Sequence, residues 1–118
     1  MKALRDDDWI TANSAMDSLI TSAYFDAAKL LETYNEPGIS EEVQWRIVYV
    51  FGHRHEPESI PLLTEALQNE IWLVHTEAAV GLCRFDPVYV IPEMKKLGNN
   101  SEKHIRNNSR WVIKQINH

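Results

Sequence analysis

Residues 74–82 read VHTEAAVGL, in which Val74, Ala78 and Leu82 recur every fourth residue, the spacing of one face of an α-helix. The same face recurs once earlier in the chain, at Val43, Ile47 and Phe51, and once later, at Ile105, Ser109 and Ile113. Both intervals are equal, and we call this repetition the 31-residue echo. Self-similarity at a period of roughly 20 to 50 residues is typical of stacked supersecondary units, none of which can bury its apolar face alone. The last three quarters of the chain are therefore predicted to be a stack of helical units.

The helical period dominates the chain, and no run of alternating apolar and polar residues predicts a strand. We therefore expect an all-α fold with about seven helices. The expected helices cover residues 7–20, 22–35, 41–55, from the turn at 56–57 to 68, 71–84, from 86–87 to 97, and from 101 to about 116.

Capping residues mark where several of these helices begin. Ser40, Asp86 and Ser101 each offer a side-chain oxygen that can accept a hydrogen bond from the first amide groups of a helix. Pro61 and Pro92 are separated by the same interval as the echo positions. Both are expected early in their helices, where a missing amide proton costs no hydrogen bond.

The length of the chain fits a single small domain. Its 118 residues, 44% of them hydrophobic, can bury one core, and no shift in composition indicates a second. We expect a capping helix within residues 1–21, where Asp6, Asp7 and Asp8 would offset the helix dipole. Repeat units are expected at 22–55, 56–85 and 86–118.

The sequence carries no targeting signal that we can identify. No stretch approaches the ~20 apolar residues of a membrane span, and the first residues lack the apolar region of a signal peptide. The single cysteine, Cys83, cannot form an internal disulfide and fits a reducing compartment. We therefore expect a cytoplasmic protein.

Charge is distributed unevenly along the chain, whose net charge is -5. Residues 1–80 hold 14 Asp and Glu against 5 Lys and Arg, whereas residues 81–118 hold 3 against 7. Because sequence order is also spatial order in a stack of repeats, one end should carry a negative field. An acidic surface favours solubility, and it also steers a basic partner.

The segments VHTEAAVGL at 74–82, Asp86-Pro87 and Ile91-Pro92 resemble HEAT repeats, especially the short repeats of phycobilisome-lyase-like proteins. They are similar to that family's V-R-x-x-A-A-x-A-L helix, its D-P turn and its V-P-x-L helix start. Ile105-Arg106 keeps the apolar-Arg pair, and Gln44 and His75 occupy the equivalent arginine positions. The resemblance spans about residues 22–118 and implies an α-solenoid of antiparallel helix pairs. In such solenoids the second helix of each pair lines the concave face.

A helical wheel predicts which residues face away from the core. If Val43, Ile47 and Phe51 are buried, Trp45, Tyr49 and Gly52 lie on the opposite side of their helix. The equivalent positions are Thr76, Val80 and Cys83, then Asn107, Trp111 and Lys114. Because aromatic anchors dominate many protein interfaces, the predicted partner-binding residues are Trp45, Tyr49 and Trp111, with Glu41, Glu42 and Glu77 as electrostatic helpers. The alternative is that these aromatics pack against a neighbouring helix.

Few residues suggest chemistry. His53 and His55 are two positions apart and so point to different sides of a helix, unlike the i, i+4 pair that shares one metal. Cys83 has no histidine near it in sequence that would activate a thiol. The sequence therefore predicts no enzyme, cofactor, metal or small-molecule substrate. A basic group in the last third could touch nucleic acid, but the pI near 5.5 argues against it: Lys95, Lys96, Lys103, Arg106, Arg110 and Lys114.

These features favour a non-enzymatic protein-binding module. The most concrete hypothesis is an immunity-type inhibitor that binds and blocks a basic toxin, such as a ribonuclease, through complementary charge. The alternatives are a bilin-handling protein like the phycobilisome-lyase relatives, a structural adaptor in a larger assembly and, less favoured, a HEAT-like DNA-binding protein.

Overall fold

Seven α-helices and two short 3-10 helices make up the fold, in a computed structural model that describes residues 2–117. The elements are η1 (Lys2–Arg5), α1 (Trp9–Thr21), α2 (Ala27–Tyr34), α3 (Glu41–Arg54), η2 (Pro57–Ser59), α4 (Ile60–Leu67), α5 (Trp72–Leu82), α6 (Pro87–Leu97) and α7 (Lys103–Ile116). No strand occurs among the described residues, so the all-α prediction with about seven helices is confirmed.

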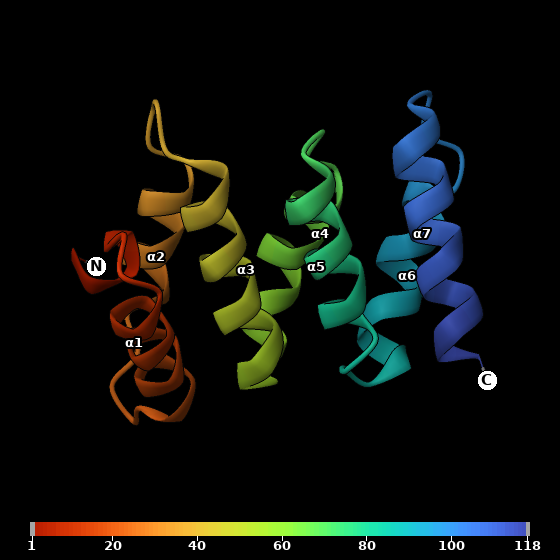
Figure 1. Ribbon diagram of the computed structural model, residues 1–118. Coiled ribbons are helices and arrows are strands. Elements are labelled where there is room, and N and C mark those ends of the chain that lie inside the picture. Colours follow the sequence, from red (N-terminus) through yellow and green to blue (C-terminus); the bar gives the residue numbers. More distant parts are fainter. Residues whose placement is uncertain (1, 118) are drawn as a thin grey trace.

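Helices α1, α3, α5 and α7 stand side by side in one row, because α3 contacts α1 and α5, and α5 in turn contacts α7 (Figure 1). Helices α4 and α6 lie behind α5 and α7 and contact each other, while α2 packs on α3. The connecting loops alternate between the upper and lower edges of Figure 1, so that consecutive helices run antiparallel. Within residues 2–117, no helix has the length and apolar composition of a membrane span.

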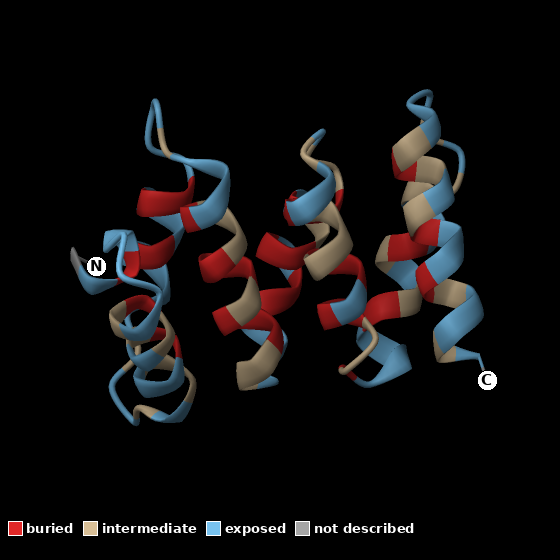
Figure 2. Ribbon diagram, in the orientation of Figure 1, coloured by how far each residue is buried: buried red, intermediate tan, exposed pale blue. Residues whose placement is uncertain are grey.

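The core forms where the two layers of helices meet, and the buried segments concentrate on the central helices (Figure 2). Ile47, Leu63 and Leu82 are completely buried there. Of the nine echo positions that predicted the buried helix face, eight are buried and Ile113 is half-buried. The apolar spacing therefore identified the side of α3, α5 and α7 that faces the core.

Two glycines set the distance between α3 and α5. A methyl group added at Gly52 would lie 3.2 Å from the Cα of Gly81 and 3.3 Å from Arg84 Nη1. Such distances are shorter than ordinary van der Waals contact, so the two backbones touch here. The helical wheel placed Gly52 on the outward side of its helix, and that prediction is wrong because Gly52 is buried in this crossing.

The helix starts agree with the sequence at two of the three predicted caps. Ser40 Oγ accepts a hydrogen bond from Val43 N at 3.2 Å, and Asp86 Oδ1 accepts one from Val88 N at 3.0 Å. Ser101 is not a cap, since the residue that precedes α7 is Glu102.

The two prolines of the echo have different surroundings. Pro61 lies in the first turn of α4, as predicted. Pro92 lies inside α6, contrary to the prediction, because α6 begins at Pro87 and already has a regular first turn. In the earlier unit, the corresponding turn is the separate 3-10 helix Pro57–Ser59.

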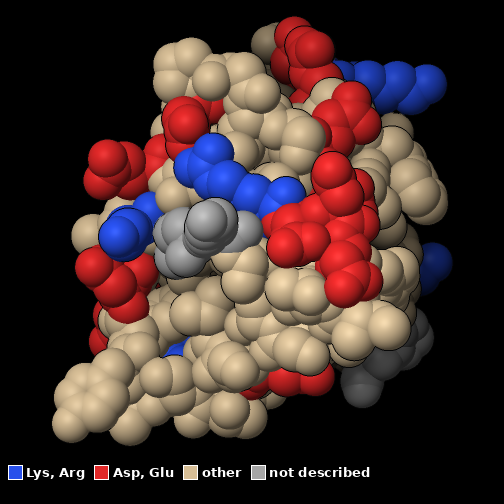
Figure 3. Space-filling view, turned by 60° about the vertical axis from the view of Figure 1, so that its left-hand side comes forward, with Lys and Arg blue, Asp and Glu red and all other residues tan. Residues whose placement is uncertain are grey.

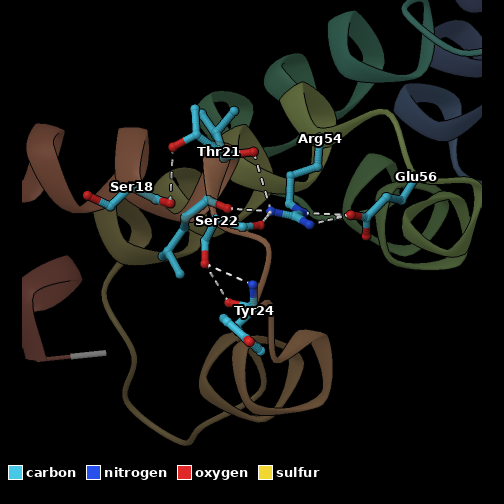
Figure 4. A network of polar contacts seen from close by, with 8 residues as sticks. Ser18, Thr21, Ser22, Tyr24, Arg54 and Glu56 are labelled. Carbon is cyan, nitrogen blue, oxygen red and sulfur yellow. Dashed lines mark hydrogen bonds and ion pairs between the residues drawn. The ribbon is translucent and has the colours of Figure 1, made fainter.

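Arginines from α3 bind the N-terminal segment through its backbone carbonyls. Arg54 Nη1 donates to Leu19 O at 2.6 Å and to Ser22 O at 2.9 Å, at the end of α1 (Figure 4). Arg46, which is buried, donates to the carbonyls of Leu4 and Asp6. The carbonyls at the end of a helix lack partners within it, so a buried guanidinium satisfies them and fixes α1 against α3.

Candidate functional site

Each helix of the row carries one of the four tryptophans of the chain, and none of the four is buried. Trp9 is 64% exposed, Trp72 71% and Trp111 43%, while Trp45 is half-buried. Tryptophan is the largest apolar side chain and is usually well covered in a monomer, so its repeated exposure on neighbouring helices is unusual. We call the outward side of α1, α3, α5 and α7 that carries these residues the tryptophan face.

The sequence singled out Trp45 and Trp111 but not Trp9 or Trp72. The helical wheel covered only positions within the echo, and Trp72 lies just before its first position in that unit, Val74. Trp9 belongs to the capping helix, which has no equivalent later in the chain. A search for tryptophans at the start of each front helix would have found both.

Aromatic rings stack along α3 at the middle of this face. The rings of Trp45 and Tyr49 are 5.4 Å apart, and those of Tyr49 and His53 are 4.0 Å apart and nearly parallel. Trp45 Nε1 donates a hydrogen bond to Glu77 Oε1 of α5 at 3.1 Å. Trp45 and Tyr49 are therefore half-buried and held in place by their neighbours. Their exposure is intermediate between the two alternatives that the sequence left open, an exposed anchor and a residue packed against a neighbouring helix.

The predicted electrostatic helpers differ in how far their charge is offset. Glu77 Oε2 lies 3.9 Å from Arg84 Nη1, and Glu42 Oε1 lies 2.7 Å from Arg46 Nη2. Glu41 is exposed, and no ion pair of its carboxylate occurs among residues 2–117. Glu77 thus orients Trp45, whereas Glu41 presents an uncompensated charge.

A small hollow of about 210 Å³ opens between α5 and α7. Thr76, Ala79 and Val80 line it from α5, and Asn108 and Trp111 line it from α7. The structure thus brings Val80 and Trp111 together as predicted, but Asn108 replaces the expected Asn107. The Asn108 Nδ2 atom is shielded from solvent and has no hydrogen-bond partner among the described residues.

A second hollow, of about 100 Å³, lies between α1 and α3, with Trp9 and Trp45 among its lining residues. Both hollows lie at seams of the same row of helices and both have a tryptophan in the wall. The tryptophan face is therefore an uneven aromatic surface with two shallow recesses.

Acidic side chains gather around the end of the molecule formed by α1 and α2, with fewer basic ones between them (Figure 3). Arg5 forms an exposed ion pair with Glu36, and its hydrogen bonds hold the pKa of the Glu36 carboxyl below its usual value. The acidic character predicted for the N-terminal part is thus present at this end of the surface.

The other candidate residues have structural contacts. His53 stacks on Tyr49, and Arg54 binds backbone carbonyls and Glu56, so the cluster at residues 53–56 does not converge. Within residues 2–117, no group of three or more His, Cys, Asp or Glu side chains could hold a metal ion. Cys83 is half-buried, and burial raises the pKa of its thiol although Arg84 opposes the shift.

The basic residues of the last third are only partly available. Arg106 Nη1 donates to the carbonyls of Asn100 and Ser101, both at 2.9 Å, and Arg110 Nη2 donates to Gly98 O at 2.8 Å. These contacts hold the guanidinium groups against the loop before α7. Lys103 and Lys114 remain exposed on α7.

No protein-family model and no curated protein matches this chain. Function is therefore inferred from the surface itself.

Proposed function

We propose that the chain is a short HEAT-like α-solenoid that works as a non-enzymatic protein-binding module. In its most concrete form, it is an immunity-type inhibitor that binds and blocks a basic toxin such as a ribonuclease. The observation that carries the proposal is the tryptophan face, with one uncovered or half-covered tryptophan on each of four adjacent helices. The 31-residue echo and the two layers of antiparallel helices support the solenoid.

The chemistry of the face fits a partner that is apolar at its centre and basic around it. Trp72 and Trp111 supply large apolar areas on rigid helices, which lose little conformational entropy on binding. Exposed acids such as Glu41, and the acidic end at α1 and α2, attract positive charge and speed encounter. A basic ribonuclease has this complementary charge, and a ligand over its active site would block it without chemistry.

Co-expression with the products of the genes that adjoin its own tests this function. The wild-type chain should restore growth to cells that make the partner toxin, and should abolish ribonuclease activity in vitro at a one-to-one ratio. Activity should return when the complex is dissociated, because a blocking protein leaves its target unmodified. An adaptor would bind without inhibition, and permanent loss of activity would indicate an enzyme.

Single substitutions locate the site. Trp72→Ala and Trp111→Ala should each weaken binding by about 30-fold, the equivalent of a hot spot of ~2 kcal/mol, with melting temperatures near wild type. Tyr24→Ala is the matched control, since Tyr24 is 93% exposed but lies in the loop between α1 and α2, outside the tryptophan face. Full protection by the Trp72→Ala/Trp111→Ala double variant would refute this site.

A further inference from the structure

A hollow of about 460 Å³ lies between α4 and α6, the helices that form the layer behind α5 and α7 (Figure 1). This volume is within the range of roughly 300 to 1,000 Å³ typical of ligand sites. Pro57 and Pro61 form part of an apolar wall on the side of η2 and α4, and Tyr89 of α6 faces them. The hollow is separate from the tryptophan face, whose recesses lie at the seams of the front row.

The charge of this hollow is negative. Glu65 of α4 and Glu93 of α6 both line it, and no lysine or arginine of the described chain does. Glu93 Oε1 lies 3.3 Å from Lys96 Nζ, but the Lys96 side chain is 70% exposed. An ion pair so open to water is weak, so a ligand cation can displace it with little loss.

The hollow also presents an aromatic ring. Tyr89 is 52% exposed, although its ring borders a cavity in which it could be covered. Thr64 also lines the hollow, although its Oγ1 atom is shielded from solvent.

We propose that this hollow binds an arginine side chain presented by a partner peptide. The planar guanidinium stacks on Tyr89 and donates hydrogen bonds to the carboxylates of Glu65 and Glu93, while its alkyl stem lies against Pro57 and Pro61. Arginine fits better than a free polyamine, because the aromatic ring and both carboxylates line one hollow, whereas a polyamine spreads its charges along a chain. The site is independent of the tryptophan face.

The test is a titration of the isotopically labelled full chain with N-acetyl-arginine methylamide at low ionic strength, followed by amide chemical shifts. Amides of residues 57–68 and 87–97 should shift. The corresponding citrulline compound, which has nearly the same shape without the charge, should leave them in place. Spermidine should bind more weakly than the arginine probe, and tighter binding of spermidine would overturn the assignment to arginine.

Variants test the geometry. Glu65→Gln and Tyr89→Ala should each lower the affinity for the arginine probe about two- to fivefold, the loss expected for one partly exposed cation contact. Glu58→Gln removes a nearby exposed carboxylate that does not line the hollow, and it should bind like wild type. Shifts that spread over all acidic regions, or equal losses in Glu58→Gln and Glu65→Gln, would show general attraction of a cation by an acidic protein and overturn the site.

Discussion

Replacing Arg54 with methionine removes the guanidinium that joins the end of α1 to the end of α3, while a long unbranched side chain remains. In the native protein Nη1 lies 2.6 Å from Leu19 O and 2.9 Å from Ser22 O, and Nε lies 2.9 Å from Glu56 Oε1. The guanidinium carbon also lies 4.0 Å from the centre of the Phe25 ring. Since the Arg54 side chain is only 9% exposed, water cannot readily replace these contacts.

The expected loss follows from these contacts. A hydrogen bond to a charged group contributes about 1.5–3 kcal/mol, but the carbonyl contacts share one nitrogen and are not additive. The Glu56 side chain is 39% exposed, so solvent screens the ion pair, which adds less than about 1 kcal/mol. We therefore expect Arg54→Met to lower the free energy of unfolding by about 3 kcal/mol, mostly through the unpaired carbonyls at the end of α1.

Urea denaturation followed by circular dichroism measures this loss. Arg5→Met is the control, because Arg5 also pairs with a glutamate but both side chains are exposed, at 41% and 45%. The control should lose much less stability than Arg54→Met, because solvent screens an exposed ion pair. Amide hydrogen exchange in Arg54→Met should accelerate more in α1 than in α7. Equal stability of the two variants would refute the role of Arg54 in holding α1.

Three further predictions concern packing and pH. Ala78→Arg should destabilise the fold by several kcal/mol, since Ala78 is completely buried and the new charge would have no room; an unchanged melting temperature would contradict the orientation of α5. Gly52→Ala and Gly81→Ala should each cost about 1 kcal/mol in urea denaturation, because overpacking at 3.2 and 3.3 Å exceeds the gain in helix propensity; a stabilised variant would exclude the close crossing. Burial raises the pKa of Tyr34 and of Cys83 in the folded state. Their contribution to the free energy of unfolding is therefore fully present below the ordinary pKa values of 10.0 and 9.0 and is lost as pH rises above them. The urea midpoint should fall in alkaline solution, and it should fall less in Tyr34→Phe/Cys83→Ser.

The apolar pattern predicted the helices because packing against the core requires apolar residues at a regular spacing along each helix. A helix that buries one face needs apolar residues at every third or fourth position, as Ile47 and Ala78 show. Arg46 and Arg54 could not be predicted in this way. Besides their ion pairs with Glu42 and Glu56, their partners are the backbone carbonyls of residues 4, 6, 19, 20 and 22, and a carbonyl is present at every position whatever the side chain.

The exposure of the candidate site was equally hard to predict. Trp45 occupies a position that the helical wheel turns outward, yet Glu77 and Tyr49 cover part of it. Whether an outward tryptophan is covered depends on the neighbouring helix, and thus on the spacing of α3 and α5. That spacing is set by Gly52 and Gly81, and a pattern of apolar side chains gives no sign of a crossing made by glycine backbones.

One polar position repeats in its structural role although its residue type changes. Gln44, His75 and Arg106 follow one another at the interval of the echo, where the HEAT-like pattern has its arginine. Each bonds a backbone carbonyl that precedes its own helix: Gln44 Nε2 to Tyr34 O at 3.2 Å, His75 Nδ1 to Asn69 O at 2.8 Å, and Arg106 Nη1 to Asn100 O at 2.9 Å. The departure of Gln44 and His75 from arginine therefore leaves the contact in place.

The loops before α5 and α7 also contain the same hydrogen bond at equivalent positions. Asn69 and Asn100 are separated by the same interval, and each side-chain oxygen accepts a hydrogen bond from the amide two positions later at 2.9 Å. The asparagine bends the chain into the next helix, and His75 or Arg106 then fixes the asparagine carbonyl. Because a carbonyl accepts a hydrogen bond from any N–H donor, the contact is kept when histidine replaces arginine as the donor. A sequence motif defined by residue identities does not detect this contact.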